Sequence, residues 1–302
     1  MPAVSIIMNV RNGAATLRAA LDSALGQTFA DWELIVWDDC STDDSAAIIA
    51  ELTDPRIRYF LAPEQTALGQ ARDAAIRCAQ GDWLAFLDQD DLWLARKLEL
   101  QLALADSRDV GLIYGRTISF SPSGKQYDYD PFHEFGPLPV GNIVAELLGK
   151  GCFIAMSSAL IRRSVVMGTG GIPAHIRITP DYFLYLAVCS KYSARAVQDV
   201  VCRYRLHAGS MTSVYRRESL EETLQLVDDW RSQVSRGDYA RRRAHISTAL
   251  AVEELRHSGS FVQGIRRLMK EGSLAWLAGR PFVHGWRMVR RKVRTPYRMH
   301  SK

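Results

Sequence analysis

The sequence lacks the segments that mark membrane-spanning, zinc-binding and disulfide-stabilised proteins. No apolar run reaches the roughly 18 residues of a membrane-spanning helix. The 5 cysteines are an odd number without a CxxC pair or a close Cys/His spacing, so we expect a reducing compartment and neither a zinc site nor a disulfide framework. The first residues, MPAVSIIMNV, lead directly into a predicted strand without a charged leader, so we expect a cytoplasmic protein.

Two signatures of other nucleotide-binding enzymes are missing near the start of the chain. The stretch MNVRNG, which follows the first apolar run, does not contain GxGxxG, and this excludes a Rossmann-type oxidoreductase. A glycine-rich, arginine-containing triphosphate loop is missing as well, which argues against a nucleotidyltransferase. The composition, with 47% hydrophobic and 24% charged residues, is that of an ordinary globular protein.

The charge of the chain is distributed unevenly. Residues 261–302 contain 11 Lys and Arg against one acid, so this tail carries +10. Because the whole chain of 302 residues carries +5, the preceding 260 residues carry −5. The tail and the rest of the chain therefore differ in character.

The first 104 residues alternate four times between a strand-like apolar run and a segment with helical spacing. This order, with short connections, predicts an α/β fold with a mostly parallel sheet flanked by helices on both faces. The predicted strands are residues 4–10, 32–39, 57–62 and 82–88, and the predicted helices are residues 14–27, 41–52, 68–80 and 91–104. Ligands of such sheets bind beyond the carboxyl ends of the strands, which carry polar residues at 9–12, 38–39 and 88–91.

The pattern loosens after a fifth predicted strand at residues 110–115. Residues 119–141 contain 4 prolines among aromatic residues, which predicts an irregular loop. Helical spacing resumes beyond Tyr215, so we predict a soft boundary near Val214. Between these two regions the predicted elements are a helix at 140–150, a strand at 157–163, a helix at 180–192, and strands joined by a turn at 194–207.

Three carboxylates, Asp88, Asp90 and Asp91, follow the fourth predicted strand in the stretch FLDQDDLW. A second acidic pair, Asp38 and Asp39, ends a neighbouring strand. A hard divalent ion held by one or two carboxylates suits a substrate diphosphate and stabilises the charge on a departing diphosphate. An alternative stays open, in which Asp90 or Asp91 caps a helix that begins at Leu92.

Four stretches, VSIIMNVRNG, WELIVWDDCSTDDS, ALGQARDAAIRCAQGDWLAFLDQDD and YRLH, resemble the successive signatures of glycosyltransferase family 2. These are inverting enzymes of the GT-A fold that use a nucleotide-diphosphate sugar. The resemblance runs from Val4 to about Ser213, and its first half is the more specific because of the order and spacing of its motifs. It implies a GT-A domain at 1–214, with a nucleotide-sugar half at 1–118 and an acceptor half at 119–214. A helical, basic extension at 215–302 would follow.

The resemblance also implies a nucleotide pocket. Asn9, Val10 and Asn12 match the wall for the nucleobase, and Asp39 matches the residue that accepts a hydrogen bond from the base ring. Arg72 matches an arginine that holds the base and diphosphate region, and the asparagine that usually follows it is Asp73 here. Asp39 has an alternative role as a strand-end turn residue, whereas Arg72 lies at the unfavourable end of a helix dipole, which favours a ligand role.

The same resemblance implies a metal-binding motif at Asp88, Asp90 and Asp91. We expect Asp88 and Asp90 at the nucleotide sugar, with Asp90 near the ribose, and Asp91 on Mg²⁺ or Mn²⁺. His207, in YRLH, is expected to assist Asp90 and Asp91 with the metal or the diphosphate. A surface or buried structural role for this histidine is the alternative.

Inverting transfer needs a base, because an acceptor hydroxyl is a poor nucleophile at neutral pH. Asp181, in ITPDYFLYL, lies where the family places this base, although Pro180 replaces the usual glutamate. The alternative is structural, since Thr179, Pro180 and Asp181 also form an ordinary helix start.

The remaining expectations concern the acceptor and the tail. Residues 119–141, with Tyr127, Tyr129, Phe132 and Phe135, and the stretch GKGCFIAMSS are expected to shape the acceptor pocket. The tail interleaves aromatic residues with arginines, which suits an anionic membrane surface on the inner face of the cell membrane. A solvated helix packed on the core is the alternative, and nucleic acid is not expected.

Together these features predict a hexosyl- or N-acetylhexosaminyl-transferase. It would move a sugar from a nucleotide-diphosphate donor, a UDP-sugar, to a hydroxyl of a glycan or lipid-linked glycan. The alternative is a non-catalytic nucleotide-sugar or glycan-binding protein of the same fold.

Overall fold

The structure, a computed structural model, describes residues 1–121, 126–127, 136–207 and 209–258. The chain forms two compact units, Met1–Tyr239 and Ala240–Lys302. The domain boundary near Val214 stays a prediction. Tyr129, Phe132 and Phe135 and the basic tail at 261–302 lie outside the described residues.

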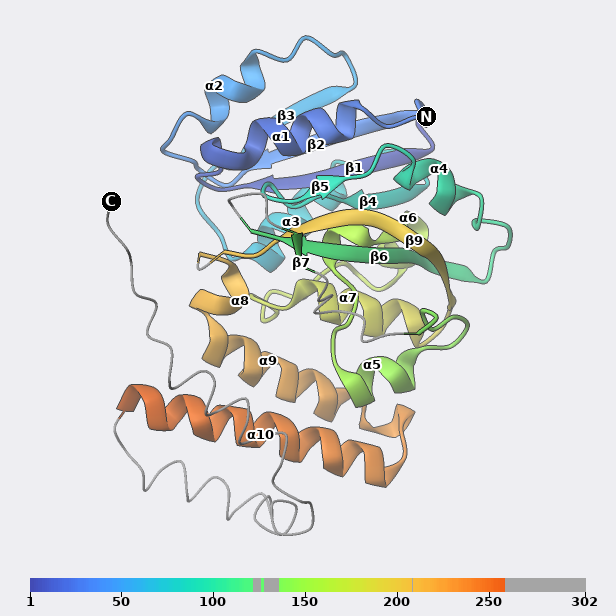
Figure 1. The fold of residues 1–302 in the computed structure, drawn as a ribbon, viewed down its shortest axis with the longest axis vertical. Helices are drawn as coiled ribbons and strands as arrows, with labels where there is room; N and C mark the ends of the chain where they lie inside the picture. The colour runs from blue at the N-terminus through green and yellow to red at the C-terminus, as the bar shows by residue number, and fades with distance from the viewer. Residues whose placement is uncertain (122–125, 128–135, 208, 259–302) are drawn as a thin grey trace. The chain divides into compact units, whose positions relative to one another are not determined.

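A mixed β-sheet forms the centre of the first unit (Figure 1). In the part of the chain that the structure describes it has 9 strands, in the order β3-β2-β1-β4-β8-β6-β9-β5, with β7 paired to β6. The strands are β1 (Val4–Val10), β2 (Trp32–Asp38), β3 (Ile57–Leu61), β4 (Trp83–Phe86), β5 (Leu92–Trp93), β6 (Val110–Phe120), β7 (Gln126–Tyr127), β8 (Leu160–Arg162) and β9 (Ser193–Arg205). Neighbouring strands from β3 to β4 are parallel, as are β6 and β9, whereas the short β5, β7 and β8 pair antiparallel with their neighbours. The predicted α/β sheet is thereby confirmed.

Helices flank this sheet on both faces. The described helices of the first unit are α1 (Ala14–Leu25), α2 (Ser45–Ala50), α3 (Leu68–Arg77), α4 (Lys97–Leu102), α5 (Val144–Lys150), α6 (Arg163–Gly168), α7 (Pro180–Cys189), α8 (Met211–Val214) and α9 (Arg216–Asp229). A further helix, α10 (Arg236–Ser258), begins in the first unit and continues into the second. After β3 the chain crosses back to β4 on the other side of β1. Because parallel crossovers are right-handed, this reversal places α3 on the face opposite α1. The carboxyl ends of β1 and β4 therefore form a topological switch point, where such folds bind ligands.

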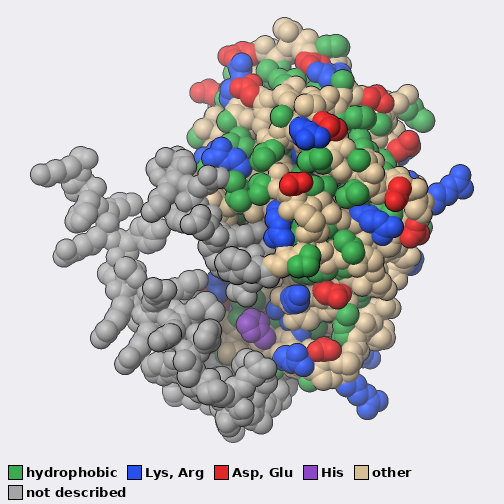
Figure 2. Space-filling view, turned by 45° about the vertical axis from the view of Figure 1, so that its right-hand side comes forward, with side chains coloured by type: hydrophobic (Ala, Val, Ile, Leu, Met, Phe, Trp, Pro, Cys, Tyr) green, Lys and Arg blue, Asp and Glu red, His purple; other side chains and the backbone are tan. Residues whose placement is uncertain are grey.

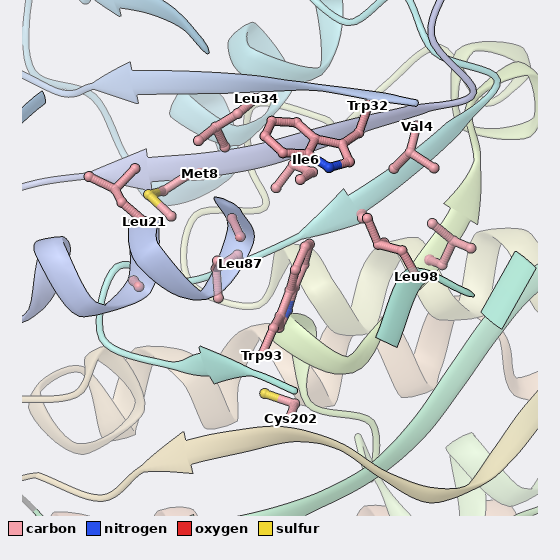
Figure 3. Close-up of a cluster of buried hydrophobic side chains, with 14 of the residues drawn as sticks. Val4, Ile6, Met8, Leu21, Trp32, Leu34, Leu87, Trp93, Leu98 and Cys202 are labelled. Atoms are coloured by element: carbon pink, nitrogen blue, oxygen red, sulfur yellow. The ribbon is translucent and has the colours of Figure 1, made fainter. Parts of the chain in front are cut away.

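Apolar alternation explains how α1 attaches to the sheet. The side chains of β1 that point to one face, Ile6, Met8 and Val10, pack in one buried cluster with Leu17 and Leu21 of α1. Figure 3 shows residues of this cluster, which also includes Trp93 and Cys202 from the strands β5 and β9. Burial of each large apolar side chain contributes about 1.5–3 kcal/mol. This shared core joins the two halves of the sheet.

The structure corrects three predicted elements. Residues 91–104 do not form one helix, because Leu92 and Trp93 pair with β9 and α4 begins only at Lys97. The predicted loop at 119–141 begins later, since β6 continues to Phe120 and pairs with β7. Residues 194–207 contain no turn, because β9 is a single strand whose irregular register against β6 takes up the extra residues.

None of the helices in the described ranges combines the length and the apolar character needed to cross a membrane.

Lys97, at the start of α4, is a buried cation in this core. Its side chain is 0% exposed, and its Nζ donates to Gln101 Oε1 at 2.6 Å and lies 4.2 Å from the centre of the Trp93 ring. Burial lowers the pKa of Lys97 from 10.5 to about 7. The folded protein therefore holds fewer protons than the unfolded chain between these two values.

We predict that Lys97→Met changes how stability depends on pH. In the wild type, Lys97 makes the free energy of unfolding rise with pH between about 7 and 10, by up to about 1.4 kcal/mol per pH unit. The reason is that the unfolded chain binds a proton in this pH range that the folded protein does not. The variant has no titrating group at this position and loses this contribution. Urea unfolding of the wild type and the variant across this pH range measures the effect. A difference between the two proteins that stays constant with pH would contradict the prediction.

Candidate active site

Polar segments from three parallel strands meet at one edge of the sheet. The last residues of β1 and β2 lie side by side, with Val10 opposite Asp38, and β4 runs along the other side of β1. The segment after β4 contains Asp88, Asp90 and Asp91. The structure thus brings together the strand ends from which the sequence predicts a site.

The turn after β1 is tied to the turn after β2. The Asn12 backbone has a φ of 49°, in the left-handed region. Its Oδ1 accepts a hydrogen bond from the Thr42 backbone N–H at 2.8 Å, and its own N–H donates to Ser41 Oγ at 3.0 Å. These bonds hold the two turns together as one wall of the site.

The two other residues predicted for this wall, Val10 and Asn9, differ from Asn12 in their surroundings. The Val10 side chain is fully buried in the core, so this residue offers only its backbone, whose carbonyl accepts from the Asp39 N–H at 2.8 Å. Both amide atoms of Asn9 are buried, and they have no hydrogen-bond partner among the residues that the structure describes. Such groups are costly unless something satisfies them, so the Asn9 amide is suited to a bound polar group.

Asp38 and Asp39 have different surroundings. Both carboxylate oxygens of Asp38 are used inside the protein, since Oδ1 accepts from the Ser41 N–H at 2.8 Å and Oδ2 from the Tyr59 hydroxyl at 2.9 Å. Asp39 Oδ1 accepts from the Thr66 N–H at 3.0 Å. Its Oδ2 has no partner within the described ranges, so it is the oxygen left to accept a hydrogen bond from a ligand.

The turn after β1 is hydrogen-bonded to the acidic segment after β4 through two residues that the sequence analysis missed, Arg11 and Gln89. The Arg11 N–H donates to Gln89 Oε1 at 2.9 Å, and Gln89 Nε2 donates back to the Arg11 carbonyl at 3.1 Å. A Cβ on Gly13 would lie 2.3 Å from Gln89 Oε1, which explains the glycine at this position. The Arg11 guanidinium also donates to the Asp39 carbonyl at 2.8 Å and to Gln65 Oε1 at 2.8 Å. The glutamine inside the DQDD stretch was the only local signal for this contact.

Arg72 is the cation that α3 supplies to the site. It is 4% exposed, and its Nη2 donates to Asp88 Oδ1 at 2.8 Å. Burial raises the pKa of Asp88, the Arg72 guanidinium opposes this rise, and the negative charge of Asp90 adds to it. The Arg72 Nε atom is buried without a partner among the described residues, so this guanidinium has a donor left for a bound anion.

Asp90 and His207 lie in direct contact. Asp90 Oδ2 is 2.7 Å from His207 Nε2, and the two side chains are 26% and 30% exposed. The Asp90 carbonyl accepts from Arg205 Nε at 2.7 Å, which fixes the backbone of the acidic segment to the end of β9. A carboxylate and an imidazole that lie in contact and are both partly exposed are suitable ligands for a divalent ion.

Asp91 is enclosed by the protein. It is 1% exposed, its Oδ1 accepts from the Arg205 N–H at 2.9 Å, and its Oδ2 accepts from Ser157 Oγ at 2.6 Å. Burial raises the pKa of Asp91 well above its ordinary value, and the charges of Asp90 and Asp88 add to this rise. Both Asp91 oxygens thus accept hydrogen bonds within the protein, and the expected role of Asp91 as a metal ligand stays a prediction. The alternative of a cap on a helix starting at Leu92 is wrong, because Leu92 belongs to β5 and α4 begins at Lys97.

Within the described ranges, no three His, Cys, Asp or Glu side chains converge to hold a metal ion. A site built on Asp90 and His207 would therefore take its other ligands from a bound diphosphate and water, as Mg²⁺ commonly does.

Asp181 lies in the first turn of α7, directly after Pro180. Its Oδ1 accepts from the Tyr182 N–H at 2.8 Å, and its Oδ2 is 3.8 Å from Cys152 Sγ. Burial raises the pKa of Asp181, and the Arg72 guanidinium opposes this rise. Because Arg72 also acts on Asp88, the structure brings Asp181 into the same electrostatic environment as the acidic segment.

Comparisons with known proteins identify the family and the fold of the chain. Glycosyl transferase family 2 matches the chain over residues 5–169. Two similar relatives from Escherichia coli are UDP-Glc:alpha-D-GlcNAc-diphosphoundecaprenol beta-1,3-glucosyltransferases. WfaP is 33% identical, with 74% of this chain and 85% of the relative covered, and WfgD is 30% identical, with 70% and 79% covered.

Solved structures of low sequence identity establish the fold. The structure of S. aureus TarS in complex with UDP-GlcNAc has a TM-score of 0.62 at 16% identity and covers 89% of this chain and 79% of that one. The mannosyltransferase PcManGT from Pyrobaculum calidifontis, in complex with GDP-Man and Mn²⁺, has a TM-score of 0.61 at 18% identity, with 97% and 80% covered. The fold is that of GT-A glycosyltransferases, and the chain belongs to glycosyl transferase family 2.

Proposed function

We propose that this glycosyltransferase moves a hexosyl group from a UDP-sugar to a hydroxyl of a lipid-linked glycan, with inversion at the anomeric carbon. The observation that supports the proposal is that the acids of the Arg72–Asp88 and Asp90–His207 pairs lie directly after β4, at the edge of the sheet where Asp39 follows β2. The Arg72 guanidinium also acts electrostatically on Asp181. The names of WfaP and WfgD, which include a UDP-sugar donor and a diphosphoundecaprenol-linked acceptor, support the substrate classes.

The donor nucleotide is bound by the strand-end turns. Asp39 Oδ2 accepts a hydrogen bond from the ring N–H of uracil, and the wall formed by Asn9 and Asn12 borders the base. Arg72 orients the diphosphate with its remaining donor while its Nη2 holds Asp88 in place. Asp88 in turn lies where it can accept from the sugar hydroxyls.

Asp90 and His207 would hold a divalent ion, Mg²⁺ or Mn²⁺. When bound, it neutralises the diphosphate and stabilises the charge that develops on the departing UDP. Asp91 supports these ligands from inside the protein, because it fixes both Arg205 and Ser157. This assignment keeps Asp90 and His207 from the expected metal residues and leaves out Asp91, because Asp90 is partly exposed and Asp91 is enclosed.

Asp181 takes the proton of the acceptor hydroxyl as the new bond forms. A raised pKa makes the carboxylate a stronger base than an ordinary aspartate, which suits proton transfer near neutral pH. Pro180 occupies the first position of α7, where a proline is favourable, and its presence is compatible with Asp181 in the first turn, where the Arg72 guanidinium acts on it electrostatically. The alternative of a non-catalytic binding protein would require that this carboxylate does not act.

The membrane surface enters the proposal through the acceptor. A lipid-linked acceptor keeps its sugar close to a bilayer, and the basic tail at 261–302 would attract an anionic surface. The tail lies outside the described residues, so its contact with the inner face of the cell membrane stays a prediction. The face drawn in Figure 2 carries basic and acidic side chains interspersed, unlike the one-sided charge of a nucleic-acid-binding surface.

We predict that Asp181→Asn retains UDP binding and loses transfer. The amide cannot accept the proton, so we expect kcat to fall by about 10²- to 10⁴-fold while the affinity for UDP stays unchanged. Transfer from UDP-glucose to a GlcNAc-diphospho-lipid measures kcat, and calorimetry measures UDP binding. Asp22→Asn, which changes an exposed aspartate on α1, is the control. Turnover close to wild type in Asp181→Asn would remove this residue from the mechanism.

We predict that His207→Ala and Asp90→Asn each weaken the binding of UDP in the presence of Mn²⁺ by about tenfold or more, because each removes one ligand of the ion. The measurement is calorimetric titration with UDP, with and without Mn²⁺. His175→Ala, which changes an exposed histidine before α7, serves as the control. Equal Mn²⁺ dependence in His207→Ala and the wild type would contradict the assignment.

A further inference from the structure

Glu222, in the middle of α9, binds the chain just before α7. Its Oε1 accepts from the backbone N–H groups of Arg177 and Ile178 at 3.0 and 3.2 Å. Its Oε2 accepts from the N–H groups of Ile178 and Thr179 at 2.9 and 3.0 Å, and from Thr179 Oγ1 at 3.0 Å. One carboxylate thus satisfies donors from three successive residues.

These contacts fix the point at which α7 begins. Thr179 is the N-cap residue, but its side chain makes no capping bond to the helix and instead donates to Glu222. Helix starts carry unsatisfied N–H groups and a partial positive charge, so a carboxylate placed there from another element is favourable. Hydrogen bonds to a charged acceptor are stronger than neutral ones. The next residues along the chain are Pro180 and Asp181.

The other side of the same segment packs against α3. The Gly69 N–H donates to the Arg177 carbonyl at 3.2 Å, and a Cβ on Gly69 would lie 1.9 Å from the Ile176 carbonyl oxygen. The segment is therefore held between α3, which carries Arg72, and α9, which carries Glu222. A ring contact between Phe183 of α7 and Trp230, with centroids 5.9 Å apart, adds a second connection between α7 and the end of α9.

We propose that Glu222 is a positioning residue for transfer, which sets the Asp181 carboxylate relative to Arg72 by holding the segment before α7. The inference rests on the proposed function, because it takes Asp181 as the base. It assigns a role in catalysis to α9, which lies beyond the residues matched by the family, 5–169. Glu222 itself touches neither Arg72 nor the acidic segment in the contacts described.

The test compares two substitutions on α9. Glu222→Gln keeps the shape of the side chain but turns an N–H₂ group toward backbone N–H donors. We expect kcat to fall about tenfold or more, since displacement of a reacting group by about 1 Å costs on the order of 10²-fold. Donor KM and UDP affinity should stay within about twofold of wild type, because the donor site is not changed. Glu221→Gln, which removes an exposed ion pair with Arg217 on the same helix, should leave kcat, donor KM and UDP affinity unchanged.

Two further variants test the same role of Glu222. Glu222→Asp retains the charge on a shorter side chain and should recover part of the lost kcat. All rates are divided by the concentration of sites that bind UDP, so misfolded protein does not count. Glu222→Ala combined with Asp181→Asn should be no slower than Asp181→Asn alone, because both changes act on the same proton transfer.

A normal kcat in Glu222→Gln would overturn the inference. A loss of UDP affinity in this variant as large as its loss of kcat would overturn it as well. Failure of both Glu222→Gln and Glu222→Ala to fold would also overturn it, because the carboxylate would then support the whole fold. If Asp181→Asn itself turns over normally, the proposed function fails, and this outcome is distinct from a normal Glu222→Gln with an inactive Asp181→Asn.

Discussion

The repulsion among four carboxylates at one edge of the sheet is the constraint to which the rest of the site responds. Asp88, Asp90 and Asp91 follow one strand, and Asp181 acts on Asp88 electrostatically. Arg72 is the cation that opposes the raised pKa of both Asp88 and Asp181. Like charges held this closely shift each other's pKa upward unless a partner compensates. The site is therefore suited to additional positive charge, which the metal ion of the proposed function would supply together with the donor diphosphate.

The protein separates the three acids of the motif by their surroundings. Asp91 is enclosed and bonded to Ser157 and to the backbone of Arg205, so it stabilises the segment. Asp90 remains accessible beside His207. The same short stretch thus contains one internal support and one accessible carboxylate, which the proposed function assigns to the ion. Rigid strand ends and the Arg11–Gln89 contacts hold these positions before any ligand binds, which lowers the cost of binding.

The sequence was sufficient for the first half of the sheet and for the strand ends that meet at the candidate site. Strands β1 and β2 are short apolar runs that end in polar residues, and parallel strands bring such ends to one edge. It was not sufficient for β5, because DLWLARKLELQLAL has helical spacing and only pairing with β9, more than a hundred residues later, makes Leu92 and Trp93 a strand. The tertiary contact overrides the local preference.

Long-range contacts also determine how the acids of the candidate site are surrounded. The burial of Asp91 depends on Ser157 and Arg205, which are 66 and 114 residues away. Glu222 contacts Thr179 across 43 residues and carries no local pattern that distinguishes it from Glu221. Spacing in the sequence identified the acids that gather at the site, but it could not tell which of them face a ligand.

The most direct test of the central claim is a crystal structure with UDP and Mn²⁺, in which anomalous scattering locates the ion. The account predicts a manganese peak between the Asp90 carboxylate, His207 and the diphosphate, with Asp91 still bonded to Ser157. A peak on Asp91 with the Ser157 bond broken, or UDP bound away from this edge of the sheet without an ion, would contradict it.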